Sequence, residues 1–281
     1  MAQPIVYGPS YSTYVRTVRL ALAEKSVAYD FRHVGMLQGE HQQPPFLERN
    51  PYGKVPAFEH DGLRLYETNV ITRYIDRAFP GTALQPADAR GLAVMDQAIS
   101  IADTFGYGAI VGKLVWQRMV VPMMKGTPDD KTVADAIPQI KLTLAEYERI
   151  LSDMAWFGGA NLSLADLHLA PIFAYMSATP EGGDLMGAHP KLGAWWSKMS
   201  ARESMAKTEP QLARRIPPSL AHGRTAAPRR APRGREWPTP TVRRWSETVA
   251  RGQSAAPGRA AKRQPGNPKR STLARSAAPP G

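Results

Sequence analysis

The pattern of hydrophobic and polar positions along the chain changes near residue 80. Before it, short apolar runs separated by turn residues are typical of strands, at residues 5–7, 27–31, 55–58 and 63–66. Between these runs, apolar residues recur at helical spacing over residues 12–25 and 68–78. The order β-α-β-α-β-β-α predicts a small α/β domain over residues 1–80 with a thioredoxin-like sheet.

Beyond a linker that runs from Phe79-Pro80-Gly81 to Pro86, the chain carries only helical spacing. The pattern predicts helices over residues 88–121, 131–153, 163–177 and 190–206. Ser163 and Asp166 have the form of a capping box at the start of the third of these helices. We therefore expect an all-α domain over residues 88–213.

The net charge of +12 belongs to the C-terminal tail. From Arg214 onward there are 16 basic residues and two acidic ones, which leaves a balance of −2 for residues 1–213. Proline and glycine are abundant in this tail and large aliphatic residues are rare, so residues 214–281 are predicted to be disordered. Two interpretations stay open: the tail has no function, as in out-of-frame translation of GC-rich DNA, or it contacts a polyanion such as nucleic acid. Aromatic side chains for base stacking are nearly missing from it, which argues against nucleic acid.

Composition excludes several classes of protein. The chain has no cysteine, so disulfide scaffolds and thiol nucleophiles of its own are ruled out. Its longest uncharged apolar stretch falls short of the roughly 18–20 residues of a membrane span, and no secretory signal is readable at its start. The six histidines show no paired metal-binding spacing. We expect a cytoplasmic protein with no metal and no membrane segment.

Two short motifs carry candidate chemistry in the first domain. Val55-Pro56 stands at the head of a strand, where a cis bond would turn the Val55 backbone toward an extended peptide ligand and a trans bond would only start the strand. Glu67-Thr68 stands at a helix start, where a carboxylate and a hydroxyl suit an amino-acid head group or serve as ordinary caps.

Ser12 and Thr13 begin the first predicted helix directly after a strand and a Gly8-Pro9 turn. A hydroxyl at this place can donate to an anion with help from the helix dipole, although a serine there is most often an N-cap. The sequence contains no serine-hydrolase elbow. A hydroxyl that stabilises a thiolate of the ligand is therefore more economical than a nucleophilic serine.

Together these motifs resemble the glutathione S-transferases. The stretch HQQPPFLERNPYGKVP at residues 41–56 and the stretch at residues 61–75 are similar to the glutathione site of that family in order and spacing. In the second domain, the 163–166 motif and the segment that starts at His189 resemble its later helices. The resemblance covers about residues 4–208 and is nearest to serine-type enzymes, of the phi kind or related bacterial forms.

The resemblance implies a catalytic residue and a reaction. Ser12 would stabilise the thiolate of glutathione, with Tyr7 and Thr13 as the two competing candidates. The chain would be a glutathione transferase that joins this thiolate to small hydrophobic electrophiles. Two alternatives stay open: a non-catalytic binding module of the same fold, and a glutathione-dependent isomerase, dehalogenase or peroxidase.

The resemblance also assigns the parts of the glutathione site. His41 and Lys54 would contact the glycine carboxylate, with Gln42 nearby, where the subgroup usually has lysine. Val55 would pair through its backbone with the cysteinyl part. Glu67 and Thr68 would then hold the γ-glutamyl ammonium and carboxylate.

Two further features concern partners. Tyr52 resembles an aromatic key that inserts into a second subunit, so we expect a homodimer, with ordinary packing as the other interpretation of Tyr52. The electrophile pocket would come from the helical domain and its neighbourhood. Its candidates are the aromatic and methionine side chains Tyr11, Phe105, Tyr107, Trp116, Met119 and Met123.

Overall fold

The computed structural model describes residues 2–210. The predicted disordered tail, residues 214–281, therefore lies outside the described residues, as does the end of the predicted 88–213 domain. Residues 2–210 fall within one compact unit. The boundary between the predicted 1–80 and 88–213 domains stays a prediction.

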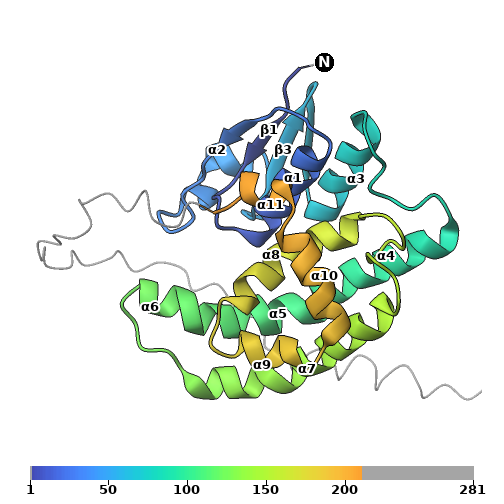
Figure 1. Cartoon of the computed structure of the whole chain (residues 1–281). Coiled ribbons are helices and arrows are strands. Elements are labelled where there is room, and N and C mark those ends of the chain that lie inside the picture. Colours follow the sequence, from blue (N-terminus) through green and yellow to red (C-terminus); the bar gives the residue numbers. More distant parts are fainter. Residues whose placement is uncertain (1, 211–281) are drawn as a thin grey trace, which may run out of the picture. The chain divides into compact units, whose positions relative to one another are not determined.

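The first part of the chain forms a four-stranded mixed sheet in the order β2-β1-β3-β4 (Figure 1). Its strands are β1 (Ile5–Tyr7), β2 (Asp30–Arg32), β3 (Ala57–His60) and β4 (Leu63–Tyr66). β1 runs parallel to β2 and antiparallel to β3. β3 and β4 form a hairpin whose turn residues Asp61 and Gly62 have φ of 48° and 80°, as a two-residue hairpin turn requires. The predicted α/β class and thioredoxin-like sheet are confirmed.

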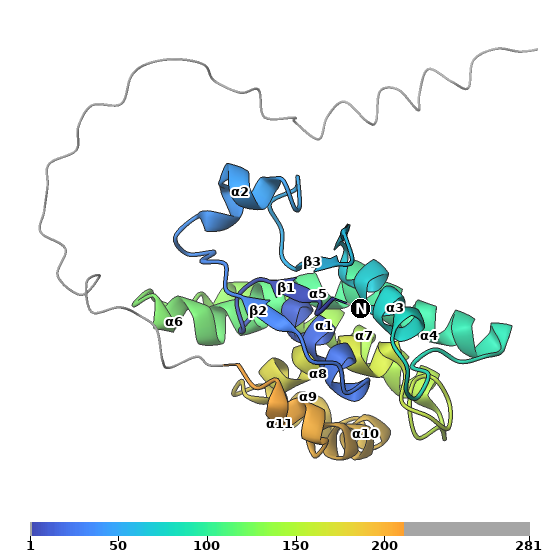
Figure 2. The same cartoon turned by 90° about the horizontal axis from the view of Figure 1, so that it is seen from above.

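Helices α1 (Thr13–Glu24) and α3 (Thr68–Ala78) carry the apolar stripes that the sequence predicts. Val15, Val18 and Leu22 of α1 are completely buried in the main core. The connection from β2 to β3 holds a 3₁₀ turn, Glu40–Gln42, and the short helix α2 (Pro44–Leu47), neither of which the periodicity predicted. Figure 2 shows α2 across the sheet from α1, where it covers a second, smaller apolar cluster.

The second part is helical throughout, as predicted. The predicted helix 88–121 is one continuous run that changes its winding: α4 (Ala89–Ile101), a π-helical segment Ala102–Gly106, α5 (Tyr107–Ala109), a π-helical segment Ile110–Val120 and α6 (Val121–Met123). Of the described helices, this 35-residue run is long and apolar enough to cross a bilayer by length and composition alone. It packs against α7 (Asp130–Leu151) and α8 (Leu164–Ser177), so we interpret it as a core helix of the domain.

The predicted capping box at the start of α8 is present, and it also makes contacts beyond this helix. The carboxylate of Asp166 accepts hydrogen bonds from the N–H and hydroxyl of Ser163, both at 2.7 Å, and from the N–H of Phe157 at 3.0 Å. The indole of Trp195 donates to it at 2.8 Å. This fully buried carboxylate therefore fastens α8 to α10 (Pro190–Ser200).

The prediction of one helix over residues 190–206 is wrong. The chain forms α10 and then a separate helix, α11 (Glu203–Lys207), and a short helix α9 (Gly182–Gly187) precedes them. Arg202 adopts an extended backbone between α10 and α11, with ψ of 142°. Its guanidinium donates two hydrogen bonds to the carboxylate of Glu24 at the end of α1, at 2.7 and 2.8 Å. This pairing turns α11 onto α1, a tertiary contact that helical spacing does not encode.

Glu24 makes the stability of this junction depend on pH. Burial alone would raise the pKa of its carboxyl, but the hydrogen bonds from Arg202 and Ser204 outweigh burial and lower that pKa. A carboxyl with a lowered pKa stabilises the fold above its unfolded pKa of about 4.3, and the contribution is lost as pH falls through the folded value. Glu24→Gln should therefore be less stable than the unchanged chain at pH 7, and the gap should narrow toward pH 3.

Urea unfolding at both pH values measures this gap. Glu203→Gln, which removes an exposed carboxylate, is the matched control and should show no such pH-dependent gap. A Glu24→Gln gap of equal size at both pH values would contradict the role assigned to Glu24.

Candidate functional site

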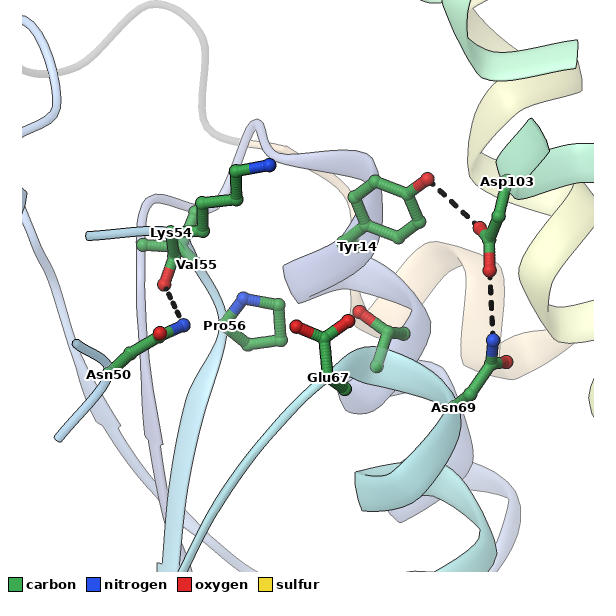
Figure 3. A pocket seen from close by; sticks show the side chains of 9 residues that line it. Tyr14, Asn50, Lys54, Val55, Pro56, Glu67, Asn69 and Asp103 are labelled. Carbon is green, nitrogen blue, oxygen red and sulfur yellow. Dashed lines mark hydrogen bonds between the residues drawn. The ribbon is translucent and has the colours of Figure 1, made fainter. Parts of the chain in front are cut away.

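A cavity of about 210 Å³ lies where the end of the sheet meets the starts of α1 and α3 and the π-helical segment Ala102–Gly106 (Figure 3). Three of the residues that the sequence singled out for the predicted γ-glutamyl and cysteinyl parts line it, together with Lys54. The full lining is Tyr14, Asn50, Lys54, Val55, Pro56, Glu67, Thr68, Asn69 and Asp103. Four segments that are separate in the sequence thus meet around one cavity.

The main chain of Val55 lies open on the wall of this cavity. The Val55–Pro56 peptide bond is cis. Within residues 2–210, neither the N–H nor the C=O of Val55 forms a hydrogen bond. Just before it, the C=O of Lys54 accepts a hydrogen bond from the side chain of Asn50 at 2.7 Å, which fixes the loop. An extended peptide can therefore pair with Val55 as an added strand does.

The start of α3 supplies a site for a zwitterionic head group. The backbone N–H groups of Thr68 and Asn69 have no hydrogen-bond partner among the described residues, so they are available to an anion. Glu67, which precedes the helix, has φ of 68° and ψ of 113°, a backbone conformation that is strained for a residue with a side chain. Its carboxylate is exposed and pairs with no described side chain, and both Glu67 and Thr68 line the cavity. A carboxylate and an ammonium can both be held here.

Ser12 caps α1 but is not among the residues that line the cavity. Its Oγ accepts a hydrogen bond from the N–H of Val15 at 3.4 Å, which leaves the hydroxyl proton free to donate. The loop that leads to Ser12 passes close to Val55. Gly8, with φ of 147°, lies so near that a Cβ there would sit 3.2 Å from the Cβ of Val55. The loop that ends at Ser12 thus begins beside Val55.

The two competing candidates for thiol activation differ in their surroundings. The hydroxyl of Tyr7 donates to the carboxylate of Glu59 at 2.9 Å, and the guanidinium of Arg49 covers the Tyr7 ring at 4.7 Å. Thr13 is 4% exposed, and its hydroxyl is buried without a hydrogen-bond partner among the described residues. The hydrogen bond of Tyr7 argues against Tyr7, whereas Thr13 is disfavoured only by its burial.

Of the predicted residues for the glycine carboxylate, Lys54 alone lines the cavity. The Lys54 side chain is exposed, forms no ion pair with a described residue, and extends away from its loop in Figure 3. Gln42 donates to the C=O of Gly53 at 3.3 Å, so the 3₁₀ turn rests against the Lys54 loop. His41 lies in the same turn, and its Nδ1 has no partner among the described residues. Neither His41 nor Gln42 lines the cavity itself.

Four lining residues were missed by the sequence reasoning. They are Tyr14, Asn50, Asn69 and Asp103. Asn50 lies inside the motif that carries the resemblance, and its place just before a turn was the available signal. The other three form one hydrogen-bonded chain: Asp103 accepts from the hydroxyl of Tyr14 at 2.9 Å and from the amide of Asn69 at 2.8 Å. No local pattern shows that residues this far apart meet.

The residues predicted for the electrophile pocket differ in their exposure and contacts. Phe105, Trp116 and Met123 are 54, 45 and 46% exposed, so apolar surface is available for a ligand. The Tyr107 ring stacks on Tyr14 with centroids 4.7 Å apart. Their role stays a prediction. Over residues 2–210, no group of three or more histidine or acidic side chains is placed to hold a metal ion.

Comparison with known families gives two matches. The family described as "Glutathione S-transferase, N-terminal domain" matches residues 3–77, and "Glutathione S-transferase, C-terminal domain" matches residues 111–203. Among curated proteins, glutathione S-transferase F6 of Arabidopsis thaliana is 33% identical over 209 residues, which are 74% of this chain and 99% of that protein. The unmatched part of this chain includes the tail beyond the described residues.

Solved structures of glutathione transferases are also similar to this chain. Glutathione transferase F7 from Populus trichocarpa has a TM-score of 0.67 at 33% identity, covering 73% of this chain and 97% of that one. Glutathione S-transferase I from maize, solved in complex with an atrazine glutathione conjugate, has a TM-score of 0.67 at 30% identity, covering 74% and 96%.

Because Asn50 fixes the loop that carries Lys54 and Val55, its loss should weaken ligand binding. Asn50→Ala removes the donor that fixes the Lys54 C=O and the acceptor of the Tyr52 N–H. Loss of these two neutral hydrogen bonds should raise the KM for the expected ligand, glutathione, about tenfold. Steady-state kinetics with glutathione as the varied substrate measure it. The exposed Asn161→Ala is the control, and equal KM values in the two variants would contradict this role for Asn50.

Proposed function

The chain belongs to the glutathione S-transferase family, and we propose how its own residues bind glutathione and activate its thiol. It is a glutathione transferase, an enzyme that joins the sulfur of glutathione to an electrophilic carbon. The observation that carries the proposal is the unpaired main chain of Val55, which lines one cavity together with residues from the starts of α1 and α3. Glutathione is a peptide with a thiol in its middle and charges at its ends, which matches this arrangement.

The tripeptide would lie along Val55 with its cysteinyl main chain paired to the Val55 N–H and C=O. Its γ-glutamyl carboxylate would accept from the N–H and hydroxyl of Thr68 at the α3 N-terminus, and its ammonium would face Glu67. At the other end, the glycine carboxylate would meet Lys54 and His41, with Gln42 behind them. Each charged end of the ligand then faces a group of opposite charge or a set of N–H donors.

Ser12 would donate its free hydroxyl proton to the sulfur. A thiol with a pKa of about 8.5 is mostly protonated at neutral pH, and the thiolate is the reactive form. Lowering the pKa by two units takes about 2.7 kcal/mol, which one charge-assisted hydrogen bond and a helix N-terminus can supply. The backbone N–H groups of Thr13 and Tyr14 have no partner among residues 2–210, so the N-terminus of α1 can contribute. Further rate acceleration would come from holding thiolate and electrophile together.

The domain assignment follows from this site. Residues 1–80 would bind glutathione, and residues 88–213 would supply the pocket for a small hydrophobic electrophile, with Phe105, Tyr107 and Trp116 among its candidates. The cytoplasm as the compartment stays a prediction from the sequence.

We also propose that the chain forms a homodimer through the face that bears Tyr52. Tyr52 is 68% exposed, which argues against ordinary packing, and its ring stands edge-on to Tyr66 at 6.0 Å. A second copy that covers the exposed Tyr52 ring would remove it from water.

Substitution of Ser12 tests the catalytic assignment. Ser12→Ala should lower kcat/KM about 50-fold with a model aryl halide, because one hydrogen bond to the sulfur anion is lost. The pH midpoint of kcat/KM should rise, since the bound thiol then ionises at higher pH. Binding of glutathione, measured by calorimetry, should change little.

Three further variants separate the candidates. Ser10→Ala, in the same loop, and Tyr7→Phe should keep kcat/KM within about threefold, which is under 1 kcal/mol. Thr13→Val tests the remaining hydroxyl. Should Ser12→Ala keep both its rate and its pH midpoint, the assignment of Ser12 would be wrong, and a drop in Tyr7→Phe or Thr13→Val would name its replacement.

Tyr52→Ala tests the dimer. Loss of a central aromatic anchor should raise the dimer dissociation constant about 30-fold, equivalent to about 2 kcal/mol. Sedimentation velocity over a concentration series measures it. Leu142→Ala removes another exposed apolar side chain, 64% exposed on α7, and should leave the dimer intact. A monomeric unchanged chain, or equal dissociation constants in both variants, would contradict the proposed interface.

A further inference from the structure

Tyr14 forms part of the cavity wall, yet none of the roles described above uses it. It lies two residues after Ser12 in the first turn of α1, and its ring faces the cavity between Lys54 and Asp103 in Figure 3. Its hydroxyl donates to one oxygen of Asp103 at 2.9 Å. The other oxygen of Asp103 accepts from the amide of Asn69 at 2.8 Å.

This hydrogen-bonded chain connects three separate segments. Tyr14 belongs to α1, Asp103 to the π-helical segment Ala102–Gly106, and Asn69 to α3. Asn69 directly follows Thr68, where the γ-glutamyl group would bind. One carboxylate therefore ties the start of α1, which carries Ser12, to the start of α3, which carries Glu67 and Thr68.

The Tyr14 hydroxyl remains a donor under all working conditions. Burial raises its pKa far above the ordinary value, and the negative charge of Asp103 raises it further. The phenol therefore stays protonated, and a carboxylate can only accept from it. Two donors on one carboxylate fix its rotation and, with it, the position of the Asn69 amide.

A role in general packing would not need the hydroxyl. The Tyr14 ring already stacks on Tyr107, with the ring planes 19° apart. An ion pair between Arg73 and Asp96 already holds α3 to α4 one turn further along. What remains for the hydroxyl is the first turn of α3 alone.

We propose that Tyr14 is a positioning residue of the glutathione site, acting through Asp103 and Asn69 to hold the γ-glutamyl-binding start of α3 at a fixed distance from Ser12. The inference rests on the proposed binding mode. It makes Tyr14 a determinant of specificity for thiols that carry a γ-glutamyl group. Recognition of the cysteinyl and glycyl parts does not depend on it, since Val55 and Lys54 lie on the other wall.

The test compares two thiols. Cysteinylglycine has the thiol and the glycine carboxylate of glutathione but lacks the γ-glutamyl group. Tyr14→Phe keeps the ring and its stacking and removes only the hydroxyl. We expect the KM for glutathione to rise about tenfold, the loss expected for one hydrogen bond to a charged group. The KM for cysteinylglycine and the kcat with saturating glutathione should stay within about twofold, which is under 0.5 kcal/mol.

A double-mutant cycle tests whether Tyr14 acts on the site through Asp103. In an Asp103→Ala background, Tyr14→Phe should raise the glutathione KM by less than about twofold, since the chain of bonds is already broken. Tyr74→Phe is the matched control: it removes a phenol hydroxyl on α3 that bonds His60 at 2.7 Å, and it should leave both KM values unchanged.

The other outcomes overturn the inference. An equal rise in KM for both thiols means that Tyr14 acts by packing, and no rise for either means that it does not act on the site. If the unchanged chain fails to conjugate glutathione, the proposed function fails and this inference fails with it. If the unchanged chain conjugates glutathione but Tyr14→Phe changes the KM for both thiols alike, only the role of Tyr14 is contradicted and the proposed function stands.

Discussion

The open main chain of Val55 is the constraint around which the site is built. A backbone N–H and C=O without partners on a cavity wall carry a free-energy penalty unless water or a ligand satisfies them. Here the neighbouring loop is held in place by Asn50, so the open edge keeps its shape. A peptide that adds itself as a strand gains two hydrogen bonds at a site that needs no rearrangement. The specificity of the site then comes from what lies at the two ends of that strand.

In the proposed binding mode, one of those ends and the thiol in the middle face helix N-termini, and this explains why so few charged side chains suffice. The starts of α1 and α3 each present backbone N–H groups that no described residue uses, and each favours negative charge. The thiolate and the γ-glutamyl carboxylate are both anions, so the fold itself supplies much of their stabilisation. In the proposed binding mode, side chains would add direction: the free proton of Ser12 toward sulfur, and the carboxylate of Glu67 toward the ammonium. The link through Tyr14 and Asp103 would keep the two helix starts in register.

Much of this could be predicted from the sequence, because local patterns determine it. Short apolar runs indicated the four strands, although β2 begins three residues and β3 two residues later than predicted. Pro56 marked a strand head, and Ser12, Ser163 and Asp166 marked helix starts where they occur. The features that the sequence analysis predicted wrongly or missed have a common cause. The break at Arg202 depends on Glu24, far away in the chain, and the place of Asp103 in the cavity depends on how the two parts of the chain pack. Contacts between distant residues leave no trace in periodicity.

The most direct test of the account is a crystal structure of the chain with bound glutathione. The account predicts that the cysteinyl main chain pairs with the N–H and C=O of Val55, that the γ-glutamyl carboxylate sits on the N–H of Thr68, and that the sulfur lies within hydrogen-bond distance of the Ser12 hydroxyl. A tripeptide bound elsewhere, or bound with the Val55 backbone still unpaired, would contradict it.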